Sequence, residues 1–428
     1  MEERTGLEGA LLRMERVRQQ RGQKEICHGI CVPSYLSKIE HGSVCPDEKI
    51  LAALFARLGI HYEEDPGILK EYQERIGEYF YRLEYQLDRR EIYEKLKAAD
   101  TALCYSRYAI DWLLIKGFEK EDVIFLLDQL KDRMSGRQTA WYQILCYEEN
   151  PASEEGFEAC RQACGVLGTS FALVEFCAAC LLQGDYTAIH RMENRVVAVA
   201  VEEGNTYQLA SYFFMKGNAY ACLNLEEMMM DCYERGIRLL QNTAWKTELL
   251  IVYYNIGATY ISLKEYGKAV EWLDRALAGY EKAREKNARE ENARRSDSDR
   301  LAEARLEAEM TTALHKKALA LARSGRREEA GKILQAVKER LLKEETYSGA
   351  DYLKYEEACM ECQENFMEKA EYHELLERLC AELKQNCHFG HLYFYRDVIS
   401  ESYKRQRKYK KALEFEQELA SRIVRYGF

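Results

Sequence analysis

The sequence predicts an all-α protein, and three observations support this class. All four prolines lie before residue 152, so the last 277 residues contain none. Glycine is sparse, and no stretch has the alternating apolar pattern of strands bounded by turn residues. Long runs instead carry apolar residues three and four positions apart, which is the helical period. The clearest example is the series Leu249, Val252, Tyr253, Ile256 and Tyr260.

Composition is that of a globular protein of 428 residues, with 47% hydrophobic and 31% charged residues. The longest uncharged run has 15 residues, fewer than the ~18 apolar residues that a membrane span needs. The first twenty residues lack the apolar segment of a signal peptide. The 15 cysteines are an odd number scattered among apolar neighbours, which favours reduced thiols over a disulfide framework. We therefore expect a cytoplasmic protein that does not enter a membrane.

Charge divides the chain into a near-neutral N-terminal part and an acidic remainder. Residues 1–60 hold 9 Lys and Arg against 8 Asp and Glu, a net charge of +1. The remainder holds 53 against 64, a net charge of −11. This asymmetry predicts a separate N-terminal module over residues 1–65 that approaches nucleic acid.

The pattern within this module predicts a helix-turn-helix. An amphipathic helix through residues 11–21 should end at Gly22, because glycine readily takes the left-handed conformation of a helix C-cap. A short helix over residues 23–28 follows. Pro33 then opens the helix SYLSKIE at residues 34–40, since proline suits the first helical position. Two short helices joined by a tight turn are typical of DNA-binding proteins.

The string QKEICHGICVPSYLSKIEHG (23–42) resembles the Cro/C1-type helix-turn-helix of bacterial regulators. In that family the residue at the position of Gln23 donates to a phosphate, and the exposed front of the helix at residues 34–40 faces the bases. The resemblance implies the DNA-contacting residues Arg18, Gln23, Ser34, Tyr35, Ser37 and Lys38. The helix over 34–40 has no Arg, Asn or Gln for a bidentate base contact, so affinity should come mainly from phosphates and from dimerisation. The alternative is a helix-turn-helix that only binds protein.

Helical pairs recur through the rest of the chain. Residues 252–280 have Gly257, Tyr260, Ala269, Leu273 and Ala276 at the spacings of a tetratricopeptide repeat. Small residues are needed at Gly257 and Ala269 because two helices cross closely there. Similar frames recur upstream and downstream at a period of about 40 residues. We expect six to eight pairs in a right-handed α-solenoid over residues 101–428, preceded by a linker helix over residues 66–100.

A charged insertion interrupts this repeat. Residues 281–308 carry 8 acidic and 8 basic side chains and almost no large apolar ones. Such a segment is typical of a solvated helical extension or a mobile loop.

The first helices of stacked pairs form the concave wall of a solenoid. Aromatic and amide side chains on such a wall suit an extended peptide, because amides pair with peptide N–H and C=O groups. The frame predicts the peptide-binding residues Phe171, Glu175, Phe214, Asn218, Tyr254, Asn255, His315 and Lys316. It places four more residues on the wall: Thr312, Tyr352, Tyr355 and Phe394. The alternative for any of these aromatics is packing between helices.

The helix-turn-helix and the repeats together resemble the RRNPP group of regulators from Gram-positive bacteria, which includes the Rgg, Rap, NprR, PlcR and PrgX relatives. The resemblance implies a cytoplasmic, homodimeric transcription regulator that binds double-stranded DNA and is gated by a short linear signalling peptide in quorum sensing. Some members bind response-regulator proteins instead. A repeat domain that binds such a partner protein is therefore the alternative function.

Enzymatic chemistry has little support in the sequence. The pairs Cys177-x2-Cys180 and Cys359-x2-Cys362 lie about 180 residues apart, whereas a structural zinc site joins two such pairs through a short loop. No phosphate-binding glycine loop, HExxH motif or nucleophile motif occurs. We therefore predict no catalytic residue, no metal and no cofactor.

Overall fold

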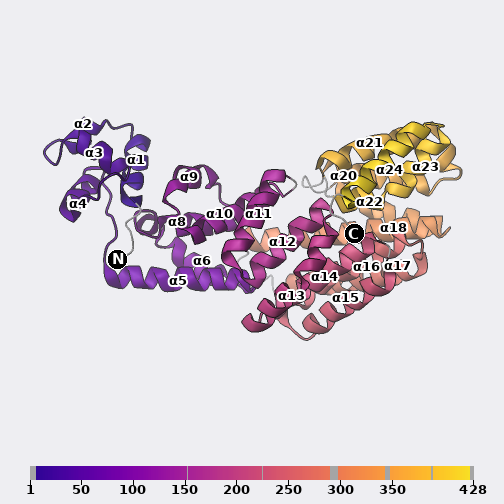
Figure 1. Ribbon diagram of the computed structural model, residues 1–428. Helices are drawn as coiled ribbons and strands as arrows, with labels where there is room; N and C mark the ends of the chain where they lie inside the picture. The colour runs from indigo at the N-terminus through magenta and orange to yellow at the C-terminus, as the bar shows by residue number, and fades with distance from the viewer. Residues whose placement is uncertain are drawn as a thin grey trace. The chain divides into compact units, whose positions relative to one another are not determined.

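The computed structural model describes residues 6–151, 153–223, 225–289, 297–342, 348–386 and 389–424. These ranges are helical and contain no strand, so the predicted all-α class is confirmed (Figure 1). The chain divides into two compact units, Met1–Phe176 and Cys177–Phe428, and the division falls inside α12 (Ser170–Gln183). Within the described ranges, no helix is both long enough and apolar enough to cross a lipid bilayer.

The helices of the first unit are short except for α5. They are α1 (Leu7–Arg18), α2 (Gln23–Cys27), α3 (Pro33–Glu40), α4 (Glu48–Arg57), α5 (Pro66–Glu84), α6 (Arg90–Lys97), α7 (Asp100–Cys104), α8 (Ala109–Phe118), α9 (Ile124–Gln129), α10 (Gly136–Glu149) and α11 (Glu154–Leu167).

The helices of the second unit are mostly longer. They are α13 (Tyr186–Glu203), α14 (Thr206–Cys222), α15 (Glu226–Leu240), α16 (Glu248–Ser262), α17 (Tyr266–Arg289), α18 (Asp297–Arg323), α19 (Arg327–Leu341), α20 (Gly349–Glu361), α21 (Ala370–Asn386), α22 (Phe389–Phe394), α23 (Arg396–Arg405) and α24 (Tyr409–Val424).

Helix α1 ends before Gly22, so the predicted terminator was wrong. Gln20 takes the left-handed conformation, with φ of 57°, while Gly22 is extended and precedes α2. The backbone N–H of Arg21 donates to the Arg16 carbonyl and that of Gln20 donates to the Val17 carbonyl. These are the two bonds of a Schellman C-cap. The Arg16 side chain also donates to the Arg21 carbonyl at 2.8 Å, so side-chain bonding stabilises this turn without glycine.

The turn residues around α3 lie where the sequence predicts them. Gly29 has φ of 74° in the turn after α2, and Pro33 is the first residue of α3. Gly42 follows α3 with φ of 67°. The Ser43 N–H donates to the Lys38 carbonyl across it at 2.8 Å, which closes the helix with a glycine C-cap.

The head, defined as residues 6–60, shares its core with the rest of the first unit. Leu12 and Phe55 of the head belong to one buried apolar cluster with Trp112 and Trp141. The ring of Phe55 stacks on that of Tyr62 with centroids 5.1 Å apart. The head is therefore continuous in packing with the helices that follow it, and the domain boundaries at residues 65 and 100 stay predictions.

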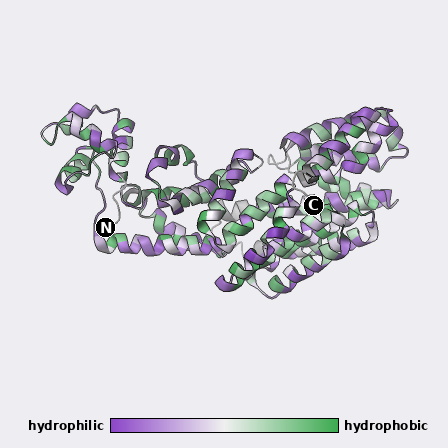
Figure 2. Cartoon of the chain, viewed as in Figure 1, coloured by the Kyte–Doolittle hydropathy of each residue, from purple (hydrophilic) through white to green (hydrophobic). Residues whose placement is uncertain are grey.

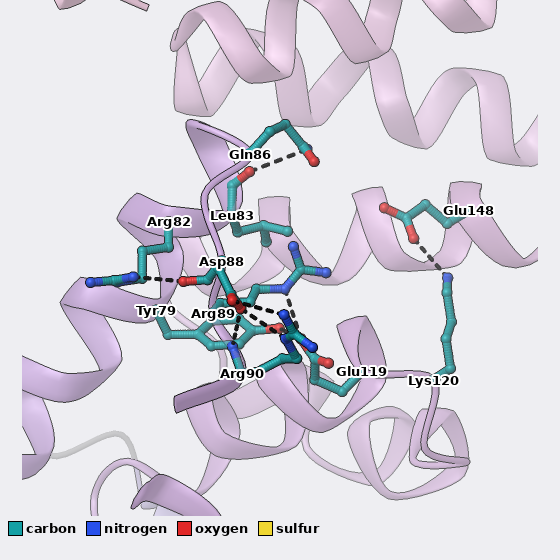
Figure 3. Close-up of polar contacts among 10 residues, drawn as sticks. All are labelled: Tyr79, Arg82, Leu83, Gln86, Asp88, Arg89, Arg90, Glu119, Lys120 and Glu148. Carbon is teal, nitrogen blue, oxygen red and sulfur yellow. Dashed lines mark hydrogen bonds and ion pairs between the residues drawn. The ribbon is translucent and has the colours of Figure 1, made fainter. Parts of the chain in front are cut away.

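A polar cluster joins α5 and α6 to the end of α8 (Figure 3). Tyr79 of α5 donates its hydroxyl to Glu119 at 2.6 Å, and Arg89 donates its Nε to the same oxygen at 2.7 Å. Burial and the Glu119 charge raise the pKa of Tyr79. Arg82 also donates to the Asp88 carbonyl at 2.6 Å. These bonds fix the corner at which α5 turns into α6.

Successive helices of the second unit pack as antiparallel pairs. The pairs are α14 with α15, α16 with α17, α18 with α19, α20 with α21, and α23 with α24. Hydrophobic and hydrophilic residues alternate around these helices, so each pair buries one face (Figure 2). Helices α10 and α11 of the first unit pack in the same way, so the described residues include at least six such pairs, and six to eight were predicted.

Small residues allow the helices of a pair to cross closely, as predicted. A Cβ on Gly257 of α16 would lie 2.6 Å from Leu273 Cγ and 3.2 Å from the Ala269 carbonyl oxygen on α17. A Cβ on Gly217 of α14 would lie 2.9 Å from the Tyr233 ring on α15. Side chains of the second helix therefore fill the space that the glycines leave.

The charged insertion is helical where the structure describes it. Helix α17 continues to Arg289 and α18 begins at Asp297, so residues 281–289 and 297–308 extend this helix pair. Residues 290–296 lie outside the described ranges.

We expect Gly257→Ala to lower the free energy of unfolding by about 1–3 kcal/mol, because the added methyl group overpacks the α16–α17 crossing. The matched control is Gly331→Ala, an exposed position inside α19 with no atom within 4 Å of an added Cβ. That control should gain up to about 1 kcal/mol from helix propensity. Urea unfolding followed by circular dichroism measures both, and equal stabilisation of the two variants would contradict the close crossing.

Candidate functional site

Two of the predicted DNA contacts, Arg18 and Gln23, are already bonded to carboxylates of the head. The exposed guanidinium of Arg18 donates to both Glu15 oxygens, at 2.5 and 2.7 Å. Gln23 donates its amide to Glu40 at 2.8 Å, and Glu40 also accepts from Arg16 at 2.6 and 3.0 Å. A guanidinium has five N–H donors, so Arg18 retains donors for a phosphate.

Helix α3 exposes part of the predicted recognition surface. Ser34 and Lys38 are exposed one turn apart on the same face. Lys38 forms no ion pair with any residue that the structure describes. Ser37 is half-buried, and Tyr35 is half-buried against the apolar cluster of the first unit. Of the four predicted DNA contacts on α3, two are therefore exposed and two are half-buried.

Residues outside the head hold both α1 and the end of α3. Tyr105 donates its hydroxyl to Glu15 at 2.8 Å, and Arg133 donates to the His41 carbonyl at 2.7 Å. The Arg133 guanidinium lies so close to Gly42 that a Cβ there would be 2.7 Å from it. The orientation of α3 therefore depends on the helices that follow the head.

The second unit contains three adjoining cavities, which we call the groove. Their volumes are about 690, 290 and 40 Å³. The two larger cavities share Ser262, Tyr393 and Phe394, and the two smaller ones share Tyr254, Lys316 and His391. Residues of α14, α16, α18 and α20, the first helices of successive pairs, line the two smaller cavities. Eight of the twelve predicted wall residues line these two cavities.

Asn218 and Asn255 lie together in the 290 Å³ cavity. Asn218 Oδ1 accepts a hydrogen bond from the Tyr233 hydroxyl at 2.5 Å, and the Asn218 N–H groups have no acceptor among the residues that the structure describes. The Asn255 side chain has no hydrogen-bond partner among the described residues. Two amides from neighbouring repeats therefore face one cavity with unused hydrogen-bonding groups.

Tyr254, His315 and Lys316 lie around the smallest cavity. Burial, with a contribution from neighbouring Lys316, lowers the pKa of His315 to about 3, so the ring is neutral. Its Nε2 lies 2.9 Å from the Lys354 carbonyl, a contact in which the neutral ring donates. Thr312 and Tyr355 also line this cavity, as the predicted wall requires.

The remaining predicted residues lie elsewhere. Phe171 is buried in the core of the first unit, where its ring packs against Trp141 with centroids 5.7 Å apart. Glu175 also belongs to the first unit, and burial with the Glu148 charge raises its pKa to about 7. Phe214 packs against Gly236 between α14 and α15. None of these three lines the groove cavities.

The predicted wall omitted several groove residues. Helix α22 adds His391 and Tyr393, and α12 to α16 add others: Leu181, Leu182, Tyr186, Ala221, Cys222, Ala258, Thr259 and Ser262. With six residues, α22 is too short to show a helical period. The aromatic cluster HLYFY at residues 391–395 is the signal that marks it.

The paired cysteines are buried in separate parts of the fold. Cys177 and Cys180 have no exposed surface, and Cys359 and Cys362 are half-buried near the end of α20. Burial raises the pKa of the latter two thiols. Among the described residues, no three His, Cys, Asp or Glu side chains gather in a metal-binding arrangement.

Comparisons with known proteins agree with this fold. The family model for the tetratricopeptide repeat matches residues 250–278. A Rap protein in complex with competence and sporulation factor aligns with a TM-score of 0.56 at 11% identity. The apo form of the quorum sensor NprR from B. thuringiensis aligns with a TM-score of 0.54 at 16% identity. Each alignment covers 83% of this chain and 99% of the other. A search of curated proteins found no match.

We expect Arg16→Ala to lower the free energy of unfolding by about 3–5 kcal/mol, because it removes the cation paired with buried Glu40. The Glu40 side chain is 1% exposed. The control is Lys95→Ala, whose pair with Glu91 is exposed and should contribute about 0.5 kcal/mol or less. Chemical unfolding measures both, and a similar small loss in the two variants would show that Glu40 does not depend on Arg16.

Proposed function

We propose that the chain is a cytoplasmic transcription regulator that binds double-stranded DNA through its head and a short linear peptide in its groove. It works as a homodimer, and peptide occupancy changes the placement of the two heads. The unused amide groups of Asn218 and Asn255 are the observation that carries the proposal.

The groove has the chemistry of a site for an extended peptide. A peptide backbone without strand partners presents N–H and C=O groups, and each amide side chain both donates and accepts. Tyr254, Tyr393 and Phe394 supply apolar walls for its side chains. The solved Rap protein is complexed with competence and sporulation factor, and NprR is a quorum sensor, which supports a signalling ligand for this fold.

The head has the exposure that phosphate binding requires. Lys38 and Ser34 face solvent on α3, and Arg18 lies exposed at the end of α1. A homodimer doubles these contacts on a two-fold site, which compensates for thin base readout. Coupling between peptide and DNA sites is typically ~1–3 kcal/mol.

An electrophoretic mobility shift assay with the DNA upstream of the chain's own gene tests the head. We expect a shift at low salt that weakens with added salt, and Lys38→Ala should reduce the salt slope by about 1 because one phosphate contact is lost. Lys95→Ala is the control lysine. Absence of a shift with and without peptide would favour the alternative, in which the repeats bind a response-regulator protein.

Capture of peptides from a randomised heptapeptide library by the immobilised chain tests the groove. Asn255→Ala should reduce capture about tenfold, since it removes one or two hydrogen bonds to peptide backbone. Asn242→Ala, at an exposed position outside the groove, should leave capture unchanged. Unchanged capture by the Asn255 variant, with its unfolding midpoint preserved, would show that the groove is not the peptide site.

A further inference from the structure

Lys316 is a buried lysine with no hydrogen-bonded carboxylate among the described residues. Its residue is 4% exposed, and it lies on α18 between the 290 and 40 Å³ cavities. No hydrogen bond or ion pair joins its ammonium group to any described residue. The ammonium instead lies 3.1 Å from the centroid of the Phe394 ring and 5.0 Å from that of Tyr395. Ring contacts leave its N–H donors without acceptors.

The nearest buried carboxylates are engaged by another cation. Arg323 of α18 donates to both Glu361 oxygens at 2.7 and 2.8 Å and approaches Glu357 at 3.5 Å. Burial and the charge of Glu361 raise the pKa of Glu357 well above its usual value. Arg323 and Glu361 compensate each other, and among the described residues neither carboxylate is hydrogen-bonded to Lys316.

The surroundings of Lys316 also lack an acceptor on the cavity side. Lys354 is a second cation at the smallest cavity, and Asp351 there accepts from Ser348 and Lys354. Burial, with the charges of Lys354 and Arg323, lowers the pKa of Lys316 well below its usual value, and Glu357 and Glu361 offset this only in part. A carboxylate in direct contact would raise that pKa and stabilise the ammonium form. A cavity of about 40 Å³ has room for one small group. An anion of carboxylate size would supply the missing acceptor.

We propose that Lys316 anchors a carboxylate of the bound peptide, at the junction of the two smaller cavities. This inference rests on the proposed function and specifies its ligand: an extended peptide with a free C-terminus or an Asp or Glu side chain at the anchored position. The amides of Asn218 and Asn255 bind its backbone in the adjoining cavity.

Three heptapeptide libraries test the proposal with the full-length chain. The first has free C-termini and all side chains, the second is amidated at the C-terminus, and the third is amidated and lacks Asp and Glu. We expect about ten- to hundredfold stronger capture of the best carboxylate-bearing peptides than of the third library. Loss in both amidated libraries identifies the terminal carboxylate, and loss only in the third identifies a side chain.

Lys316→Met removes the charge and keeps the length of the side chain, so this variant should capture all three libraries equally. Lys317→Met is the control, because Lys317 is the next residue of α18 and pairs with Asp274 on α17. It should retain the preference. Equal preference in the wild type and the Lys316 variant would overturn the anchor while leaving the peptide site intact. Capture of none of the libraries would overturn the proposed function itself.

A stability measurement without peptide provides an independent readout. Removal of a buried amine without hydrogen-bond acceptors should give Lys316→Met a higher thermal midpoint than Lys317→Met. A lower midpoint than that control would show that the chain already supplies a counter-charge for Lys316, and it would overturn the proposal.

Discussion

The close crossing of paired helices is the constraint on which the second unit depends, and it also determines the chemistry of the groove. The ring of Tyr233 packs against Gly217, where a methyl group would lie within 3 Å of it. The hydroxyl of the same tyrosine donates to Asn218, the next residue of α14. Adjacent residues point about 100° apart around a helix. Gly217 therefore lies at the packed crossing of α14 and α15. Asn218, which is held by the hydroxyl of the same tyrosine, faces the cavity.

The parts of the fold and site that sequence could predict are those with a repeated spacing. The glycine and alanine positions placed α16 and α17, and the same frame placed Asn218, Asn255, Tyr254 and Lys316 in one groove. The repeat frame placed Phe171 on the groove wall, and this was wrong because its ring packs against Trp141 in the core of the first unit. Burial of a large aromatic side chain in a core is more favourable than exposure on a wall. Helix α22 was missed since six residues carry no measurable period.

Ion pairs in the head determine which of its charged side chains carry its net charge. Glu15 and Glu40 are buried and bind arginines of α1, so these carboxylates cancel charge without facing solvent. Lys38 remains exposed on α3 without an ion pair to any described residue. Each of these pairs cancels one positive charge, so the net charge of +2 over residues 6–60 is carried by the other charged side chains of the head, among them Lys38, which a phosphate would meet.

An occupant of the groove must contact groups that also hold the unit together. Phe394 covers Lys316 and packs against the apolar clusters of α16, α18 and α21. A carboxylate bound to Lys316 would compete with that ring for the ammonium, because a charge-assisted hydrogen bond is the stronger contact. A ligand shifts a conformational equilibrium only by its difference in affinity for the two states. If a carboxylate binds Lys316 as proposed, the contact between Lys316 and Phe394 would provide such a difference, because the carboxylate would take the place of the ring.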